Sequence, residues 1–129
     1  MAKPRILVVD DEETIRDTLY YWFNERGFEV DSAFDGLDAV EKCRQNHYDA
    51  ITMDLNMPRM TGAEATTVIK QSRPDLPIIL FTGTPMDWEG VKLEGAAMVL
   101  TKPLQLRDLE GEIRRLIDGH EANEAKNKE

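Results

Sequence analysis

The sequence has little that suits an exported or membrane-bound protein. Its single cysteine, Cys43, cannot form a disulfide within the chain, so nothing implies an oxidising compartment. No apolar run approaches the length of a membrane-spanning helix. The basic start, Met1–Arg5, precedes an apolar run that stops at Asp10 and is too short for a signal peptide. We therefore expect a cytoplasmic protein that does not use a membrane.

Positive charge is also scarce. The 16 Lys and Arg residues are outnumbered by 25 Asp and Glu residues, which gives a net charge of −9. Tight binding to nucleic acid depends on clustered Lys and Arg, so this balance argues against direct contact with a phosphate backbone. The 129 residues, of which 41% are hydrophobic, fit a single globular domain. We expect this domain to span 1–119, followed by a polar tail or linker over 120–129.

Short apolar runs alternate with helical patterns along the whole chain. Strands are expected at about 6–9, 28–33, 49–54, 78–82 and 97–101. Helices are expected at about 13–26, after 35, at 61–72 and at 104–117, with a short or irregular one before 95. This alternation predicts an α/β fold with a doubly wound, five-stranded parallel sheet.

Local signals predict where several helices begin and end. Gly27 suits the position just after a helix, and Asp35 suits the position just before one. The helix after Asp35 is expected to turn Leu37 inward. Thr61 and Glu64 have the spacing of a capping box, so a helix should begin there.

Acidic residues stand where two of the predicted strands end. Asp54 closes an apolar run and opens a loop marked by proline and glycine, and Asp10 and Asp11 follow the first strand. Right-handed crossovers bring the carboxyl ends of parallel strands to one edge, where Thr82 and Lys102 also fall. Carboxylates that are crowded together need a proton or a cation, so the sequence predicts a reactive or metal-binding edge.

Four segments at these strand ends resemble the signature of bacterial response-regulator receiver domains. They are Val9–Glu12, Met53–Pro58, Phe81–Gly83 and Leu100–Pro103, and the likeness extends over about 5–118. Each segment alone is common, but four together at strand ends are specific. The resemblance implies a flavodoxin-like sheet of order 2-1-3-4-5 with five helices.

The resemblance also implies a phosphorylation site. Asp54 would be the phosphoacceptor, which takes a phosphoryl group from a phosphohistidine. Asp11, Asp54 and the main-chain carbonyl of Asn56 would bind Mg2+ directly, with Mn2+ as an alternative ion, and Asp10 would act mainly through water. Elementary chemistry agrees, because a carboxylate attacks an anionic phosphoryl group poorly until nearby cations offset the charge.

Further residues take implied roles around Asp54. Thr82 would hydrogen-bond the phosphoryl oxygens, and Lys102 would be their cationic partner. The Lys102–Pro103 peptide is cis in relatives, which fits the tolerance of proline for cis bonds. Asn56 and Thr84 are small and polar at positions that tune water access in the family. We therefore expect slow self-dephosphorylation and a phosphoryl lifetime that is not exceptionally long.

The sequence departs from the family in two places. Val99 stands three positions before Lys102, where receivers usually carry an aromatic or histidine switch residue. Valine is stiff at χ1 and has no ring to relocate, so we expect the usual aromatic coupling to be absent. The segment from Thr82 to Gly95 is about two residues shorter than the family norm, which predicts the short or irregular fourth helix.

The expected function is phosphorelay signalling, without catalytic turnover of an external substrate. The implied partners are a sensor histidine kinase or phosphotransfer protein and a downstream protein or output domain, with a homodimer as a further option. One alternative is a degenerate receiver that works only as a binding scaffold. Another is a phosphohydrolase of the haloacid-dehalogenase kind. That class needs an acid where this chain has Asn56, and usually a cap domain for which there is no room.

Overall fold

One parallel sheet organises the protein. The computed structural model describes residues 3–55, 57, 59–83, 96, 98–101 and 105–127. The five strands lie in the order β2-β1-β3-β4-β5. They are β1 (Arg5–Val9), β2 (Glu29–Ala33), β3 (Ala50–Asp54), β4 (Ile78–Thr82) and β5 (Met98–Thr101). The predicted doubly wound sheet and its order are confirmed.

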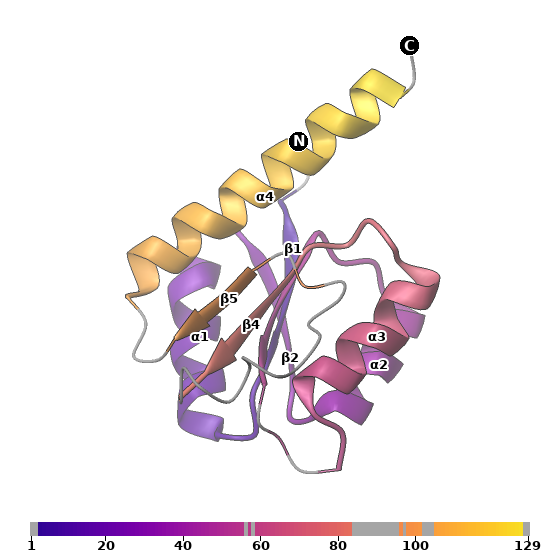
Figure 1. Cartoon of the computed structure of the whole chain (residues 1–129). Helices are drawn as coiled ribbons and strands as arrows, with labels where there is room; N and C mark the ends of the chain where they lie inside the picture. Colours follow the sequence, from indigo (N-terminus) through magenta and orange to yellow (C-terminus); the bar gives the residue numbers. More distant parts are fainter. Residues whose placement is uncertain are drawn as a thin grey trace.

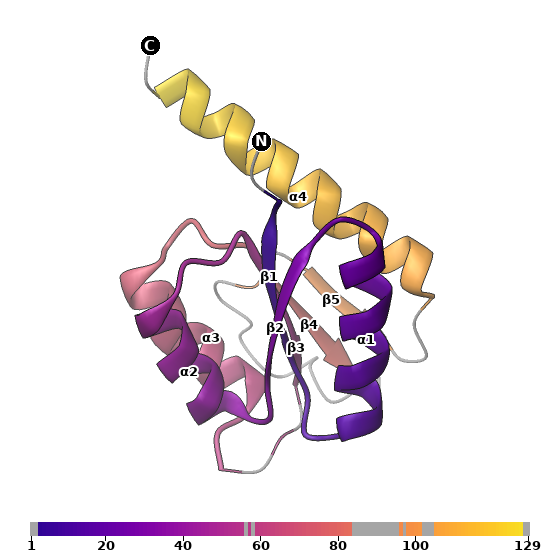
Figure 2. The same cartoon turned by 180° about the vertical axis from the view of Figure 1, so that it is seen from behind.

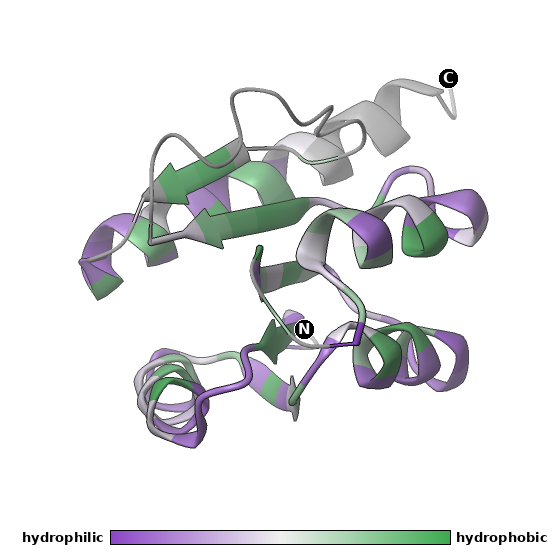
Figure 3. Ribbon diagram, turned by 60° about the horizontal axis from the view of Figure 1, so that its bottom comes forward, coloured by the Kyte–Doolittle hydropathy of each residue, from purple (hydrophilic) through white to green (hydrophobic). Residues whose placement is uncertain are grey.

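Two pairs of helices cover the two faces of the sheet (Figures 1 and 2). The helices are α1 (Glu13–Glu25), α2 (Gly36–Gln45), α3 (Gly62–Ser72) and α4 (Leu106–Asn127). Helices α2 and α3 share one buried cluster with the sheet, and α1 and α4 share the other. The more apolar strands appear as green bands between the helical layers, whereas β2 (EVDSA) also carries polar residues (Figure 3).

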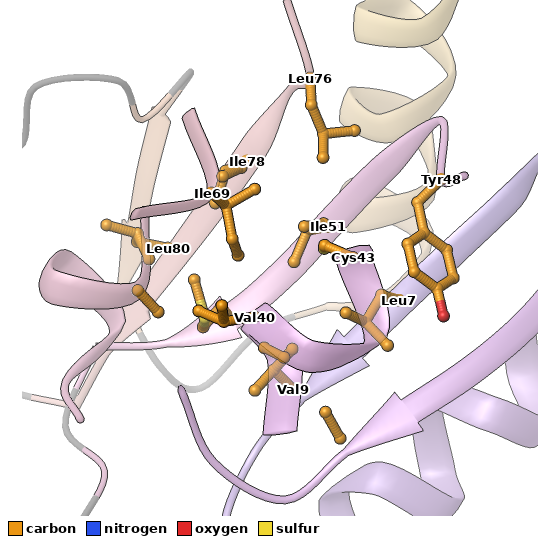
Figure 4. Packing of buried hydrophobic residues seen from close by; sticks show 14 of the residues in the cluster. Leu7, Val9, Val40, Cys43, Tyr48, Ile51, Ile69, Leu76, Ile78 and Leu80 are labelled. Carbon is orange, nitrogen blue, oxygen red and sulfur yellow. The ribbon is translucent and has the colours of Figure 1, made fainter. Parts of the chain in front are cut away.

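Alternation along each strand supplies both cores. In β1, Leu7 and Val9 face α2 and α3, whereas Ile6 and Val8 face α1 and α4. All four side chains are at most 2% exposed. Figure 4 shows the first cluster, in which Ile69 of α3 lies with the strand residues. Strands that are buried on both faces require continuous apolar runs, as the sequence shows.

The predicted helix ends at three positions are confirmed. Gly27 has φ +94°, a left-handed conformation that glycine adopts without steric cost, just after α1 ends. The side chain of Asp35 accepts a hydrogen bond from the Asp38 amide and caps α2. Thr61 and Glu64 form the predicted capping box at the start of α3.

The prediction that Leu37 turns inward is wrong. Its side chain is 44% exposed. The buried stripe of α2 instead runs through Gly36, Ala39, Val40 and Cys43. These residues are spaced by one helical turn, and Leu37 lies beside their row.

The last helix differs from its prediction at its end. We expected α4 to stop near Ile117 with Gly119 behind it, but the helix continues to Asn127. Its final buried residue is Ile117. Gly119 therefore lies within the helix, where glycine is tolerated at about 1 kcal/mol relative to alanine. The segment predicted as a tail is largely helical, and the domain boundary at 119 stays a prediction.

Two other expectations concern parts of the chain outside the described residues. The short fourth helix was predicted within 84–95, and the predicted start of the last helix at 104 also falls outside. Within the described part of the chain there are four helices. None of these is both long and apolar enough to cross a lipid bilayer.

Candidate functional site

Three neighbouring strands end in polar residues at one edge of the sheet. Asp10 follows β1, and Asp54 is the last residue of β3. The residues before them, Val9 and Met53, are partners in the parallel pairing of β1 with β3. This register brings Asp10 and Asp54 to the same level at the carboxyl edge, as the sequence predicted.

The third polar residue at this edge is Thr82. Asp54 pairs with Phe81 of β4, and Thr82 is the next residue along that strand. The exposed fractions are 1% for Asp10, 5% for Asp54 and 0% for Thr82. Most buried residues of this protein are apolar, so three buried polar side chains at adjacent strand ends mark this edge as a site.

The turn after β1 is held in place by hydrogen bonds. The Asp10 amide donates to the carbonyl oxygen of Ala33 (3.2 Å), and Nη1 of Arg16 donates to the carbonyl oxygen of Asp10 (2.7 Å). The Glu12 amide donates to Oδ1 of Asp10 (2.9 Å). These contacts fix the Asp10 carboxylate at the start of α1.

Carboxylates gather at this turn with the right chemistry for a hard cation. Asp10, Asp11 and Glu12 each offer an oxygen, and these atoms lie within 4.8 Å of one another. Mg2+ prefers such oxygen ligands and keeps several waters, so the donor set fits it. Glu12 was not among the predicted metal ligands. Its place in the acidic run after β1 is the sequence signal that points to it as a further possible oxygen donor.

The loop after Asp54 returns closely to the sheet. The Leu55 amide donates to the carbonyl oxygen of Phe81 (2.7 Å), and the Gly62 amide donates to the carbonyl oxygen of Leu55 (3.0 Å). A Cβ atom at Gly62 would lie 2.4 Å from the carbonyl oxygen of Asp54. Only glycine lets α3 begin this close to the backbone of Asp54.

The remaining predicted site residues have different outcomes. Asn56, Thr84, Lys102 and Pro103 lie outside the described residues, so their roles stay predictions. Val99 lies in β5, half-buried, and packs against the cluster between the sheet and helices α2 and α3. The position predicted for a switch residue therefore holds an aliphatic core contact.

Among the described residues, the perturbed groups Cys43, Tyr48 and Lys70 do not form a second reactive site. Burial raises the pKa of the Cys43 thiol to about 11, which keeps it protonated and unreactive. Burial and the neighbouring Asp31 carboxylate raise the pKa of Tyr48. Burial lowers the pKa of Lys70, although Asp75 opposes the shift. The perturbed groups reflect packing rather than chemistry.

Comparison with known proteins gives the same reading as the geometry. The family model described as the response regulator receiver domain matches residues 6–114. The chain is 34% identical over 119 residues to the transcriptional regulatory protein PrrA of Mycobacterium tuberculosis, covering 91% of this chain and 51% of that protein. The chain thus spans about half the length of the curated relatives it matches.

Solved structures agree with this relationship. A response regulator receiver domain protein from Clostridium thermocellum has a TM-score of 0.85 and 29% identity, with 92% of this chain and 98% of that chain covered. The response regulator TrrA from Thermotoga maritima, solved in complex with Mg(2+)-BeF, has a TM-score of 0.80 and 32% identity, with 88% and 98% covered. The matched family, the sheet order and the acidic edge agree, and the chain belongs to the response regulator receiver domains of two-component phosphorelay signalling.

Proposed function

We propose that this domain accepts a phosphoryl group on Asp54 and thereby changes its affinity for a protein partner. The observation that carries the proposal is the burial of Asp54 beside Asp10 at the carboxyl edge, within the matched family region. A buried carboxylate at a strand end is held in one position. That fixed position favours attack on a bound phosphoryl group.

The proposed reaction is a transfer from nitrogen to oxygen. A carboxylate oxygen of Asp54 forms a bond to phosphorus, and the bond between phosphorus and the donor histidine nitrogen breaks. The nitrogen keeps the electron pair of that bond. The product is an acyl phosphate, which water can hydrolyse, so the modification is reversible and suits a signal.

The residues at this edge also support a metal site. Asp11, Asp54 and the main-chain carbonyl of Asn56 would hold Mg2+, with Asp10 acting through water and Glu12 as a further oxygen donor. Mn2+ takes similar oxygen ligands and is an alternative. Bound there, the cation would neutralise carboxylate charge and polarise the phosphoryl oxygens.

Two further residues complete the proposed site. Thr82 ends β4 beside the partner of Asp54, where its hydroxyl would donate to a phosphoryl oxygen. Lys102 follows β5 in the sequence, and a lysine there would supply a point positive charge. Positioning and electrostatics of this kind account for most of the catalysis of phosphoryl transfer.

The proposed partners follow from the family. A sensor histidine kinase or phosphotransfer protein would supply the phosphoryl group, and a downstream protein or an output domain would read the result. A second copy of the chain is a further candidate partner. Val99 leaves no ring to move at the switch position, so we expect the signal to reach the partner without an aromatic rotation. We expect all of this to take place in the cytoplasm.

A direct test is phosphorylation by a small acyl phosphate in the presence of Mg2+. We expect intact-mass spectrometry to show one added phosphoryl group on the wild type and none on Asp54→Asn. The Asp54→Asn variant keeps the size of the side chain but removes the nucleophilic charge.

Asp31→Asn is the matched control, because it makes the same chemical change on β2, away from Asp54. It should accept one phosphoryl group like the wild type. An adduct that persists in Asp54→Asn, or a wild type that stays unmodified with every donor and kinase tried, would refute the proposal.

A further inference from the structure

The loop after Asp54, residues 55–61, is tied to the start of α2 by an ion pair. Nε of Arg59 donates to Oδ2 of Asp35 (2.8 Å), and Nη2 of Arg59 contacts the same oxygen. The Asp35 side chain is 3% exposed, whereas the Arg59 side chain is 55% exposed. A buried carboxylate thus fixes an arginine five residues after the proposed phosphoacceptor.

Asp35 holds two elements at once. Its Oδ2 accepts from Arg59, and its Oδ1 accepts from the Asp38 amide (2.8 Å) at the first turn of α2. Burial acts to raise the pKa of Asp35, but the Asp38 amide and the Arg59 guanidinium lower it further, so the net pKa is below its usual value. The carboxylate is therefore ionised, and its two oxygens join α2 to the loop.

The loop backbone is unusual at the point of attachment. Arg59 has φ 67°, a left-handed conformation that is unfavourable for a residue with a Cβ atom. The next residue, Met60, lies against Gly36, where a Cβ atom would come within 2.7 Å of the Met60 carbonyl oxygen. Surrounding contacts must hold Arg59 in this conformation. Those described are the ion pair with Asp35 and the approach of the guanidinium to the Phe34 ring.

The described residues of the loop are held at three points. Leu55 donates to β4 at the start of the loop, Gly62 packs on the Asp54 carbonyl just after its end, and Arg59 between them is held by Asp35. We propose that Arg59, held by Asp35, is a positioning residue that sets the loop after Asp54 for Mg2+ binding and phosphoryl transfer. This inference rests on the function proposed above.

The reason for expecting this effect is the position of a proposed metal ligand within the same loop. The proposed main-chain ligand, the carbonyl of Asn56, lies between Asp54 and Arg59 in the sequence. Release of Arg59 would let its left-handed backbone relax, and we expect that change to pass along the loop to the proposed main-chain ligand. Removing a group that orients a metal ligand typically costs about 10- to 100-fold in metal affinity or activity.

Three variants distinguish the effect of the ion pair between Asp35 and Arg59 from an effect on the stability of α2. Arg59→Gln removes the guanidinium, and Asp35→Asn removes the charge while keeping an oxygen that can cap α2. Both should weaken Mg2+ binding about tenfold in calorimetry and slow phosphorylation by an acyl phosphate. Arg59→Lys keeps the charge without the two-donor fork and should restore part of the loss.

The double variant Asp35→Asn with Arg59→Gln should lose no more than either single variant, because both remove one interaction. Hydrogen exchange of the loop peptide, without Mg2+, should be faster in both single variants. Glu110→Gln is the matched control. Glu110 is a buried carboxylate that accepts from Arg26 and Arg114 where α1 ends, so its neutralisation should leave Mg2+ affinity and phosphorylation unchanged.

The outcomes distinguish this inference from the proposed function. If the wild type is phosphorylated and Arg59→Gln matches it in Mg2+ affinity and rate, the positioning role is wrong and the proposed function stands. The positioning role is also wrong if Glu110→Gln weakens Mg2+ binding as much as Asp35→Asn does. A wild type that is never phosphorylated overturns both.

Discussion

The carboxylates at the two edges of the sheet have different surroundings. Towards the amino ends of the strands, Asp31 and Glu110 have cationic or hydroxyl partners. Oδ2 of Asp31 accepts from Arg5 Nη2 (2.8 Å) and from the Tyr48 hydroxyl (2.7 Å), and Glu110 lies between two arginines. These contacts join β1, β2 and the segment before β3, and they stabilise the fold.

At the carboxyl edge Asp35 is paired with Arg59, but the carboxylates of the turn after β1 lie next to one another. The oxygens of Asp10, Asp11 and Glu12 fall within 4.8 Å, and Asp54 is buried at the neighbouring strand end. Like charges at such distances repel and lower stability unless a cation is bound. The comparison indicates that carboxylates at the amino edge stabilise the fold, whereas those at the carboxyl edge form the proposed phosphorylation site. Four experiments test this difference between the two edges.

The largest expected effect concerns close packing at the carboxyl edge. In Gly62→Ala the new methyl group would lie 2.4 Å from the Asp54 carbonyl oxygen and 2.9 Å from Leu55 Cα, so the backbone must shift. We expect a loss of about 3 kcal/mol in the free energy of unfolding, measured with denaturant, together with slower phosphorylation.

Gly111→Ala is the control for that experiment. Apart from its chain neighbours and the backbone of α4 itself, no atom of the described residues lies within 4 Å of a Cβ at Gly111, which is inside α4. Alanine is the better helix former, so this variant should gain about 0.5–1 kcal/mol. Similar small effects from both substitutions would show that the contact at Asp54 is not tight.

The second prediction concerns the crowded acids. Without Mg2+, Asp11→Asn should be as stable as the wild type or more stable, because one like charge is removed. At a Mg2+ concentration a hundred times its dissociation constant, the wild type should gain about 2.7 kcal/mol. Asp11→Asn should gain much less. The measurement is thermal unfolding with and without Mg2+. If Mg2+ stabilises the two proteins equally, Asp11 is not a ligand of the metal site.

The carboxyl edge could be predicted from the sequence because its signals are local. Each strand is an apolar run, and Asp10, Asp54 and Thr82 stand directly at strand ends. Parallel strands with right-handed crossovers must bring those ends together, so no knowledge of side-chain contacts was needed. The capping residues Asp35 and Thr61 were predictable for the same reason, since a cap acts within one turn.

Contacts between distant segments could not be predicted in this way. The pairing of Asp35 with Arg59 joins residues 24 positions apart and depends on the left-handed backbone at Arg59, which has no sequence signature. The predicted burial of Leu37 was wrong because the few apolar residues of the short helix α2 do not define which of its faces is buried. The predicted end of α4 was wrong because Gly119 resembles a helix terminator, whereas a helix can continue through glycine.

The third prediction tests the amino edge. Asp31→Asn removes the charge that holds Arg5 and Tyr48, which are joined by part-buried hydrogen bonds. A partly exposed ion pair with such bonds is worth about 1 kcal/mol, so we expect a loss of that size in denaturant unfolding. Mg2+ affinity should not change. A loss of Mg2+ affinity in this variant would mean that the two edges are not separate.

The smallest effect is the pH dependence that Glu110 contributes. Burial acts to raise the pKa of Glu110, but hydrogen bonds from Arg114 and Arg26 lower it more, so the net pKa lies below the usual 4.5. A carboxyl with a lowered pKa stabilises the fold above its unfolded pKa, and this contribution is lost as the pH falls through the folded value. Denaturant unfolding from pH 7 to 3 should therefore show a smaller acid loss in Glu110→Gln than in the wild type. Since Glu110 is remote from Asp54 in the fold, phosphorylation should keep its wild-type pH profile. A changed profile would mean that this ion-pair network reaches the reactive edge, and the division between the two edges would then be wrong.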